Sequence, residues 1–348
     1  MSGVEVEIAA GADHASWTDY LSAAPGATLF HDWRWGEVIA DVYGYETLRL
    51  VARRAGAVVG VAPLTDVRSP LLGRSLISTA FTVGGGAVAD DAGVGEALAD
   101  AARSLGEARR VSYVELRGGA AAHAGWIAKQ GVYASFEKKL PANADEILAQ
   151  IPRTRRAEIR KALALAAAGR LSIRHGAGVD EFYPIYARSL RDHGTPAMPR
   201  RFIESLAAAF ADETEIALVS FDGAPVAALL SFWHGERVMP YYVGALDGAR
   251  EARAFDYLYY QLMRRAVDKG AGVFDFGRSK IGSTHFKTKT YWGFEPAPLT
   301  YYVALVRAKT PPNVNPANPK FALAARAWKR LPTPLANAVG PVLARNFA

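Results

Sequence analysis

Two stretches of the chain repeat the same order of local elements. The first reads LRLVARRAGAVVGVAPL (residues 48–64) and the second reads IALVSFDGAPVAALLSF (residues 216–232), so that Gly56 aligns with Gly223 and Val59 with Val226. Each stretch predicts a strand, a glycine turn and a second strand. A helix and a strand are predicted after each, over residues 95–116 and 254–276. This order favours duplication of one unit, and a chance similarity of two hairpins is the alternative.

The order of the predicted elements also limits the fold class. Strands and helices do not alternate strictly, so a doubly wound parallel sheet is not expected. The sequence predicts an α+β (mixed α/β) fold of two domains, each a mostly antiparallel sheet flanked by helices. We expect the first domain over residues 1–141 and the second over 142–307, with inserted helices at 144–168. Residues 308–348 are expected to form a basic, proline-rich tail with short amphipathic helices.

The composition is typical of a globular protein. Of the 348 residues, 50% are apolar and 22% are charged, and the length is sufficient for two domains. The absence of cysteine excludes disulfides, thiolate metal sites and cysteine nucleophiles, and is consistent with a reducing compartment. The seven histidines are scattered without the spacing of metal ligands, so no metal site is predicted. The first residues lack the apolar run of a secretory signal, and no stretch approaches the roughly 20 apolar residues of a membrane span, so we expect a cytoplasmic protein.

The positive charge is concentrated at the C-terminal end. The formal net charge is +7, and no acidic residue follows Glu295. Seven cations follow residue 306: Arg307, Lys309, Lys320, Arg326, Lys329, Arg330 and Arg345. The remainder is therefore formally neutral, which does not indicate a body built for duplex nucleic acid. Residues 320–331 place aromatic and apolar side chains beside cations, which predicts either peripheral contact with the inner face of the cytoplasmic membrane or a packing helix or loose tail.

Residues 273–296 are the strongest candidate site. The segment VFDFGRSKIGSTHFKTKTYWGFEP begins as an apolar strand that we expect to end at Gly277. A cationic loop is predicted next, with four cations before an aromatic cluster at residues 291–294: Arg278, Lys280, Lys287 and Lys289. Side chains that follow the end of a buried strand can converge on a ligand, whereas an isolated run of cations is usually solvated.

Several neighbouring residues carry alternative interpretations. Asp275 is a candidate base, or else a structural partner of Arg278. Arg278 and Lys280 suit a phosphate or carboxylate of a substrate. His193 is either a substrate contact or a turn histidine with a satisfied hydrogen bond. Of Tyr241 and Tyr242, at the centre of a predicted strand, one must face the core and the other is a candidate for substrate binding.

Two further stretches could bind anions. The predicted helix 152–168 carries five cations against one acid, Glu158, which indicates either a solvated face or a stripe for phosphate or RNA backbone. The cations are Arg153, Arg155, Arg156, Arg160 and Lys161. The glycines at 84–86 permit close backbone approach to a ligand, but no Walker motif follows, and a tight turn is the simpler interpretation.

The sequence resembles the FemAB-like acyltransferases of the GNAT superfamily, in particular the branch associated with exosortase and exopolysaccharide systems. The segment 273–296 carries the resemblance. Five more stretches follow the family order over roughly residues 28–306: FHDWRWGEVI, VVGVAPLTDVRSPLLGRSLIST, RTRRAEIRKALA, RDHGTPAMPRRF and MPYYVGAL. The resemblance implies two tandem GNAT-like domains, in agreement with the repeated order of elements.

The resemblance also implies an enzyme of class EC 2.3.-, an N-acyltransferase. It would move an acyl or aminoacyl group from an activated donor to an amine of a cell-envelope acceptor, a peptidoglycan precursor or an exopolysaccharide-related molecule. The donor would be aminoacyl-tRNA or an acyl-CoA or acyl-carrier thioester, with no permanently bound cofactor. The segment GALDGAREARA (residues 244–254) lacks the CoA loop of simple GNAT enzymes, which weakens the case for CoA without excluding it. The alternative is a non-catalytic scaffold that binds glycan or peptide in an exopolysaccharide or protein-sorting system.

In the family, a lysine of a Phe-Lys element faces the donor carbonyl. Phe286 and Lys287 match that element, but two extra residues separate it from the Trp-Gly-Phe that follows. Lys289 stands three residues before Trp292 and is the alternative. Either lysine could stabilise a developing oxyanion, a contribution of about 3–4 kcal/mol for one such donor. We therefore predict Lys287, Lys289 and Asp275 as catalytic residues, and Trp292 among the residues that bind substrate.

Overall fold

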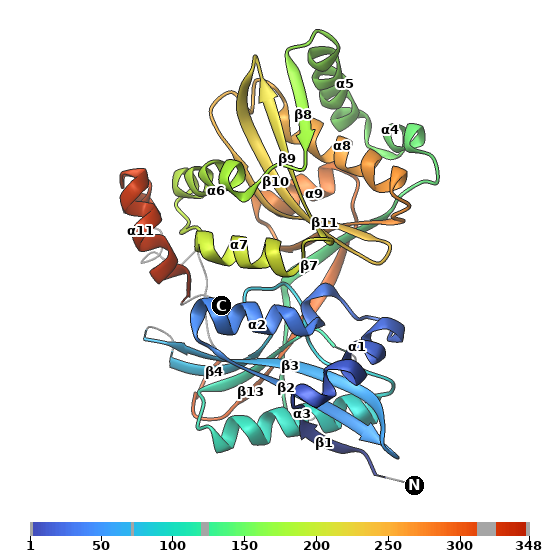
Figure 1. Cartoon of the computed structure of the whole chain (residues 1–348), viewed down its shortest axis with the longest axis vertical. Coiled ribbons are helices and arrows are strands. Elements are labelled where there is room, and N and C mark those ends of the chain that lie inside the picture. Colours follow the sequence, from blue (N-terminus) through green and yellow to red (C-terminus); the bar gives the residue numbers. More distant parts are fainter. Residues whose placement is uncertain (1–2, 71–72, 120–124, 312–324, 346–348) are drawn as a thin grey trace. The chain divides into compact units, whose positions relative to one another are not determined.

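The computed structural model describes residues 3–70, 73–119, 125–311 and 325–345. The chain divides into two compact units (Figure 1). Unit 1 comprises residues 1–131, 299–315 and 342–348, and unit 2 comprises residues 132–298 and 316–341. The division falls inside strand β7 (Ile127–Lys139) and strand β13 (Pro296–Leu305). The predicted boundary after residue 141 therefore differs from this division, because two strands each contribute residues to both units.

Unit 1 is a mostly antiparallel sheet covered by helices. Its strands follow the order β1 (Glu5–Ile8), β2 (Glu46–Arg54), β3 (Ala57–Ser69), β4 (Gly73–Ser78), β6 (Tyr113–Arg117) and β13. A short strand, β5 (Val88–Ala89), pairs with β3. The helices are α1 (His14–Ala23), α2 (Trp33–Tyr43) and α3 (Ala92–Ala108), with 3-10 turns at Gly11–Asp13 and Leu29–His31. Of the pairings in this order, β4 with β6 is parallel.

Unit 2 repeats this plan with more helices. Its strands follow the order β7, β12 (Val273–Lys280), β11 (Arg237–Ala245), β10 (Ala224–His234), β9 (Thr214–Phe221) and β8 (Leu171–His175). Its helices are α4 (Ile147–Gln150), α5 (Arg153–Ala167), α6 (Val179–His193), α7 (Arg200–Ala209), α8 (Ala254–Asp268) and α9 (Thr284–Tyr291), with a 3-10 turn at Ala144–Glu146. Helix α11 (Thr333–Ala344) follows near the C-terminal end. Here β11 and β12 form the parallel pair.

The two hairpins that the sequence predicts are built alike. Ala55 and Gly56 turn β2 into β3 with φ angles of 50° and 84°, and Asp222 and Gly223 turn β9 into β10 with 49° and 81°. Two successive positive φ values match the right-handed twist of the flanking strands, which is why glycine occupies the second position in both turns. In each unit a helix (α3 or α8) then connects the two parallel strands. The predicted α+β fold of two tandem units is therefore confirmed.

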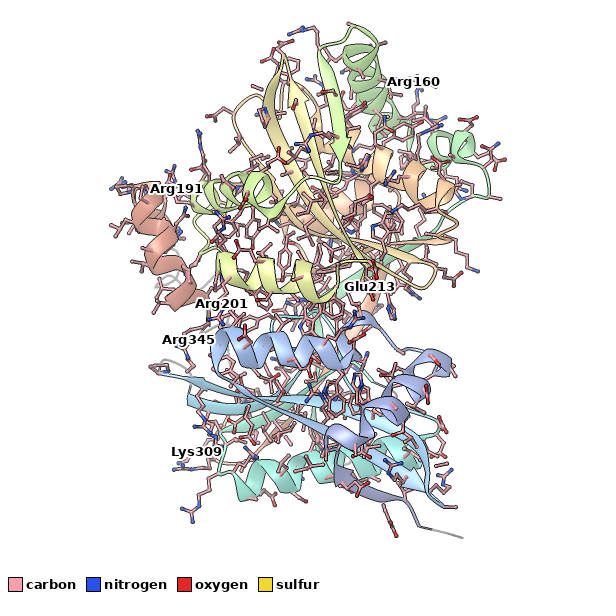
Figure 2. All side chains as sticks on the ribbon, in the orientation of Figure 1. Arg160, Arg191, Arg201, Glu213, Lys309 and Arg345 are labelled. Atoms are coloured by element: carbon pink, nitrogen blue, oxygen red, sulfur yellow. The ribbon has the colours of Figure 1, made fainter. Side chains whose placement is uncertain are left out.

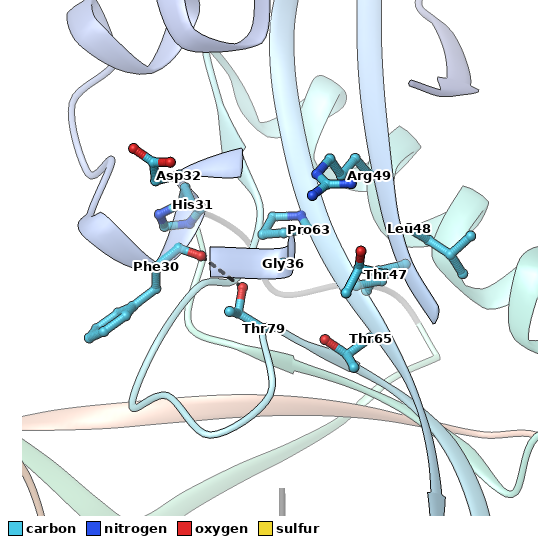
Figure 3. A pocket seen from close by; sticks show the side chains of 11 residues that line it. Phe30, His31, Asp32, Gly36, Thr47, Leu48, Arg49, Pro63, Thr65 and Thr79 are labelled. Atoms are coloured by element: carbon cyan, nitrogen blue, oxygen red, sulfur yellow. Dashed lines mark hydrogen bonds between the residues drawn. The ribbon is translucent and has the colours of Figure 1, made fainter. Parts of the chain in front are cut away.

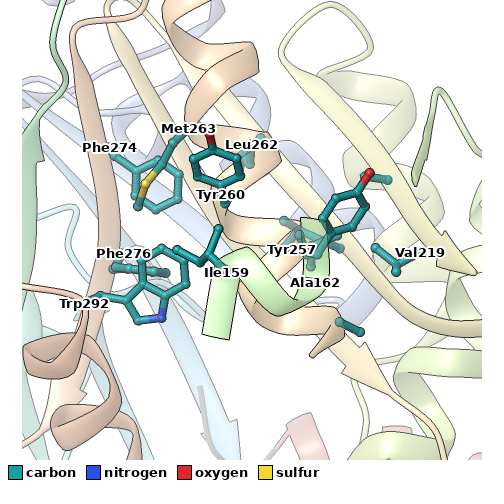
Figure 4. Packing of buried hydrophobic residues seen from close by; sticks show 14 of the residues in the cluster. Ile159, Ala162, Val219, Tyr257, Tyr260, Leu262, Met263, Phe274, Phe276 and Trp292 are labelled. Carbon is teal, nitrogen blue, oxygen red and sulfur yellow. The ribbon is translucent and has the colours of Figure 1, made fainter. Parts of the chain in front are cut away.

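The core of unit 2 lies between its sheet and helices α5 and α8. Ile159 and Ala162 of α5 pack against Tyr257 and Tyr260 of α8, and the aromatic residues of β12 complete the cluster (Figure 4). Phe274 and Phe276 are buried and stand on one face of the strand, as the alternation of β residues requires. Asp275 therefore points to the opposite face. Within the described ranges, no helix has the length and apolar content that crossing a membrane requires.

Candidate active site in the second unit

Strands β11 and β12 pair over only two positions and then separate. The parallel ladder joins Arg237 to Val273 and Val238 to Phe274. Beyond these residues β11 continues along β10 to Ala245, while β12 continues along β7 to Lys280. The facing edges of the two strands therefore carry peptide groups that the β11–β12 ladder does not use. We call residues 239–245 of β11 and 275–280 of β12 the strand divergence.

Each of the two strands carries a bulge within the divergence. Leu230 of β10 pairs with Tyr242 and the next residue, Ser231, pairs with Pro240, which leaves Tyr241 as the extra residue of β11. In β12, Phe276 and Gly277 lie between the pairs Asp275–Glu137 and Arg278–Ser135, opposite one residue of β7. Bulges redirect side chains and leave backbone groups outside the ladder. The prediction that this strand ends at Gly277 is therefore wrong: the bulge, with Gly277 at φ 65°, carries the strand on to Lys280.

Lys289 holds the β12 bulge from helix α9. Its Nζ donates hydrogen bonds to the carbonyl oxygens of Phe276 (2.6 Å), Arg278 (3.0 Å) and Gly277 (3.3 Å). It also lies 5.4 Å from the centre of the Phe136 ring. An ammonium group has three N–H donors, so these carbonyls use all of them. Burial lowers the pKa of Lys289 to about 8; Asp275 opposes that shift and Arg278 adds to it.

Asp275 is the acidic residue of the site. Its pKa is raised to about 6, first by burial and further by Glu137, the residue directly opposite on β7. The Gly277 N–H donates to its Oδ1 at 2.7 Å, and Arg237 and Lys289 lower the pKa in part. Glu137 is itself held by Arg237, with Nη1 and Oε2 2.6 Å apart. A carboxyl group with a pKa near neutrality can accept a proton during a reaction and release it afterwards.

His285 of α9 lies close enough to Lys289 and to His193 for their charges to affect its pKa. Burial lowers the pKa of His285, and Lys289 and His193 lower it further. His193 ends α6, and its Nδ1 donates to the carbonyl oxygen of Ser189 at 2.6 Å. This matches the interpretation of His193 as a histidine with a satisfied hydrogen bond, and it also brings His193 near the site. Sequence reasoning missed His285, because its spacing of four residues from Lys289 brings the two side chains together only if the segment is helical.

Helix α9 separates the two candidate lysines. The prediction that both lie on a loop is wrong, because Thr284–Tyr291 is helical, with the Ser283 hydroxyl accepting from the Phe286 N–H at its N-terminus. Residues two apart on a helix point about 200° apart around its axis. Lys289 faces the bulge. The Lys287 side chain is exposed and forms no hydrogen bond or ion pair with the described residues.

The remaining predicted residues divide between the site and the core. The Arg278 guanidinium lies over the Tyr133 ring, 4.3 Å from its centre, and Lys280 pairs with Tyr133 in the β12–β7 ladder. Tyr241 is half-buried against Phe232, whereas Tyr242 is buried against Tyr186 of α6. Trp292 is 1% exposed and packs against Tyr259 and Phe276, so its contacts are those of a core residue.

The cations of α5 are partly neutralised within unit 2. Arg155 binds Asp256 of α8 at 2.7 Å, and Lys161 binds Glu158 at 2.6 Å. Arg253, which precedes α8, also binds Glu158, at 2.9 Å. Arg160 is exposed and points outward from the helix (Figure 2). The cationic face that α5 presents to solvent is therefore narrower than the sequence suggests.

In unit 1 the chain itself fills the corresponding region beside the parallel strands. The glycine loop that follows β4 returns to β6, with the Gly86 N–H donating to Arg117 O at 3.1 Å and Ala87 bridging to Gly119. A Cβ at Gly86 would lie 2.2 Å from the Gly118 carbonyl oxygen, so only glycine fits. The glycines at 84–86 thus serve close backbone packing. Among the described residues, no group of three or more His, Asp or Glu side chains could hold a metal ion.

Comparisons with known proteins agree with this geometry. Residues 153–288 match the family model described as an acetyltransferase (GNAT) domain. The structure is similar to the crystal structure of FemX, with a TM-score of 0.67 and 15% sequence identity, over 92% of this chain and 100% of FemX. It is also similar to a tandem GNAT protein from the clavulanic acid biosynthesis pathway, with a TM-score of 0.55 and 14% identity, over 89% of this chain and 100% of that chain. No curated protein matches the sequence significantly.

The family match and the fold agree with each other. Residues 153–288, all in unit 2, match a GNAT domain, and the chain is similar in fold to a tandem GNAT protein. The particular arrangement is similar to that of FemX, as the resemblance to FemAB-like proteins predicts.

Proposed function

We propose that the protein is an N-acyltransferase whose reaction takes place at the strand divergence of unit 2. One observation carries this proposal: the two parallel strands separate at paired bulges, beside a carboxyl group and an ammonium group with shifted pKa values. The peptide groups of β11 that lie beyond its ladder with β12 offer N–H donors for a carbonyl oxygen that becomes negative during the reaction. The match to an acetyltransferase (GNAT) domain supports the same region.

The reaction would be aminolysis of an activated ester or thioester. The acceptor amine attacks the donor carbonyl, a C–N bond forms, and the C–O or C–S bond to the leaving group breaks. Asp275 takes the proton from the attacking amine and then passes it to the alkoxide or thiolate that departs. The protein accelerates the reaction largely by holding the amine and the carbonyl in contact, because the reaction needs little covalent help from the protein.

We assign Lys289 a positioning role, and we assign Lys287, an exposed cation on the same helix, no part in the reaction. Lys289 fixes the bulge only while it is protonated, because three donors are needed for three carbonyls. The pKa values of Asp275 (about 6) and Lys289 (about 8) then predict a rate that rises through about pH 6 and falls above about pH 8.

For the donor and the acceptor we propose chemical classes and not single molecules. We propose aminoacyl-tRNA or an acyl-CoA or acyl-carrier thioester as donor, and an amine of a cell-envelope precursor as acceptor. The resemblance to FemAB-like transferases supports an aminoacyl donor, and the match to an acetyltransferase (GNAT) domain supports a thioester. Mass spectrometry of molecules retained on the purified protein would separate the two: bound tRNA favours the first, and bound CoA without tRNA favours the second.

Four variants test the site. Transfer is measured from aminoacyl-tRNA and from acetyl-CoA to a peptidoglycan precursor peptide with a free amine. Asp275→Asn should reduce the rate by about 100-fold or more, the size of effect typical of a lost acid–base group. Lys289→Met should reduce the rate by about 100-fold, the size of effect typical of a site displaced by about 1 Å, because the bulge loses three hydrogen bonds. Lys289→Arg should retain transfer and lose the decline above pH 8, because arginine stays protonated. Lys287→Met, on the same helix, is the matched control for folding and charge.

The outcome of these assays also distinguishes the proposed transferase from the alternative function, a non-catalytic scaffold that binds glycan or peptide. Wild-type rates in folded Asp275→Asn and Lys289→Met proteins would show that the chemistry lies elsewhere. If wild-type protein transfers nothing from either donor and still binds the precursor peptide, the scaffold function is the better description.

We further propose peripheral membrane contact through residues 320–331, which would bring the enzyme to a lipid-linked acceptor. Residues 320–324 lie outside the described residues. The neighbouring helix α11 exposes Leu335 and Val339, four residues apart on one face, at 48% and 38% exposure. Flotation with phosphatidylglycerol vesicles should be lost when the chain is cut after Ala308, and unchanged flotation would refute the proposal.

A further inference from the structure

Three arginines of helix α5 in unit 2 have no partner in the part of the chain that the structure describes. Arg153, Arg156 and Arg160 form no ion pair and no side-chain hydrogen bond there. The Nε of Arg156 is buried and also lacks an acceptor, although buried donors are normally satisfied. Arg155 of the same helix differs, because it binds Asp256 at 2.7 Å. The three unpaired guanidinium groups therefore have N–H donors for a ligand.

The same three arginines lie on one face of α5. Each residue turns a helix by about 100°, so positions three and seven residues apart fall within about 60° of one another around the axis. Arg153 and Arg160 are exposed, and Arg160 points outward from the helix (Figure 2). Ala157 and Ala164 share this face and are too short to cover the arginines. Glu158, the one acid of α5, projects at least about 140° away from them.

Arg49 of unit 1 shows what a guanidinium looks like when the protein itself holds it. Its Nη2 donates to the Trp33 carbonyl oxygen at 2.8 Å, and the group lies 3.9 Å from the centre of the Trp33 ring. Arg49 and Asp32 both line a hollow between α2 and the strands β2 and β3 (Figure 3). This hollow encloses about 10 Å³, the space of a single water molecule. Arg49 therefore serves the packing of unit 1, whereas the three arginines of α5 have no such contacts.

The spacing and charge of the three arginines fit a chain of phosphate groups. They span seven residues, which is about 10 Å along the helix axis. Each strand of a nucleic-acid duplex carries one phosphate for about every 3.4 Å of its axis, so about three phosphates match this length. Arginine presents its N–H donors in a fork that suits two oxygens of one phosphate. A membrane surface fits less well, because this face carries alanines where a membrane-binding helix needs large apolar residues.

We infer that the outer face of α5 binds the phosphate backbone of a single-stranded nucleic acid. Such binding neutralises phosphates, releases their counterions and does not read the base sequence. A stripe of three arginines, on a chain that is formally neutral before residue 307, suits a short strand and not a long duplex. The inference concerns binding to unit 2 alone. If the strand is RNA, its use as the carrier of the acyl group rests on the proposed function.

Fluorescence anisotropy of the full chain with labelled single strands tests the inference. A short RNA and a DNA of the same sequence, both without secondary structure, are titrated in sodium chloride from about 50 to 200 mM. Three neutralised phosphates give a slope of about −2 for log affinity against log salt, so wild-type affinity should fall by about 20-fold or more over this range. Both strands offer the same phosphates, and the tighter of the two identifies the nucleic acid that the face prefers.

Variants of α5 locate the binding. Replacing the three arginines together (Arg153→Gln, Arg156→Gln and Arg160→Gln) should reduce the magnitude of the slope by about 2. Replacing all three by lysine retains the charges and should retain the slope. Arg160→Gln alone, at an exposed position, should reduce the slope by about 0.7, which covers the case that the triple variant does not fold.

Two variants outside α5 and two competitors complete the test. Lys287→Met removes an exposed cation from α9 and should leave the slope unchanged. Lys289→Met should also bind as the wild type does, so a failure of this inference is distinguishable from a failure of the proposed reaction. No binding by the wild type, or an unchanged slope in the folded glutamine variants, would overturn the inference. Stronger competition by phosphatidylglycerol vesicles or by polyglutamate than by unlabelled RNA and DNA at equal charge would also overturn it, in favour of a membrane or an acidic protein.

Discussion

Replacing Asp275 by asparagine should make the protein more stable and less active. The pKa of Asp275 is about 6, against 3.8 for an ordinary aspartate. Each pKa unit corresponds to about 1.4 kcal/mol, so ionised Asp275 disfavours the folded state by roughly 3 kcal/mol at neutral pH. Asparagine keeps an oxygen that can accept from the Gly277 N–H and carries no charge. We therefore expect Asp275→Asn to unfold with a free energy up to about 3 kcal/mol higher at pH 7.

The raised pKa of Asp275 also predicts how the free energy of unfolding changes with pH. Since the folded pKa of Asp275 is raised, its protonated form stabilises the fold below about pH 4, and that stability is lost as the pH rises through about 6. The wild type and the variant should thus converge near pH 4 and differ most above pH 6. Urea unfolding followed by circular dichroism between pH 4 and pH 8 measures both. Asp222→Asn is a control of opposite sign, because the hydrogen bonds that Arg170 donates to Asp222 lower the pKa of this carboxyl group.

Two outcomes would refute this reasoning. Equal stability of the wild type and Asp275→Asn at pH 7 would mean that burying the ionised Asp275 carboxylate does not lower the free energy of unfolding. A difference in stability that persists unchanged from pH 4 to pH 8 would mean that it arises from packing and not from ionisation.

Two structural predictions concern unit 2. Glu215→Gln should destabilise the protein by about 3 kcal/mol at pH 7, because the lost carboxylate leaves Arg265 without its partner at 2.5 Å. Although burial alone would raise the pKa of Glu215, hydrogen bonds from His175 and Arg265 hold it far below its usual range, so urea unfolding should show the difference shrinking only in strong acid. Gly244→Ala should cost about 1–3 kcal/mol in thermal unfolding, because its Cβ would lie 2.6 Å from the Tyr186 Cα, in backbone that cannot move aside easily.

Local signals predicted the elements that depend on local chemistry. The hairpins follow from alternating apolar residues and from Gly56 and Gly223 in turns that need positive φ. Helix α2 begins where Asp32 accepts from the Arg34 N–H and ends at Gly44, whose φ of 67° is left-handed. The conformation of these turns and helix ends depends on residues only a few positions away along the chain, so the sequence alone was enough to predict them.

The candidate site was only partly predictable because its geometry is tertiary. Helix α9 has three threonines in eight residues and little amphipathic pattern, so propensity favoured a loop. What stabilises it is the bond of Lys289 to the β12 bulge and the packing of Phe286 against Phe136. The place of Trp292 in the core was also not predictable from the sequence. An aromatic residue beside cations can bind a ligand or fill a core, and its spacing along the chain does not distinguish the two roles.

The duplicated plan explains why the same order of elements need not give two equivalent sites. Both units place a helix between two parallel strands, but in unit 1 the glycine loop forms hydrogen bonds with β6, whereas in unit 2 the strands separate at two bulges. A Cβ at Gly86 cannot be accommodated, so the closed form of unit 1 is fixed by residues that have no counterpart at the bulges of unit 2. We therefore assign the proposed chemistry to unit 2, where the strands separate at a bulge that Lys289 holds, and not to unit 1, where the glycine loop packs on the backbone.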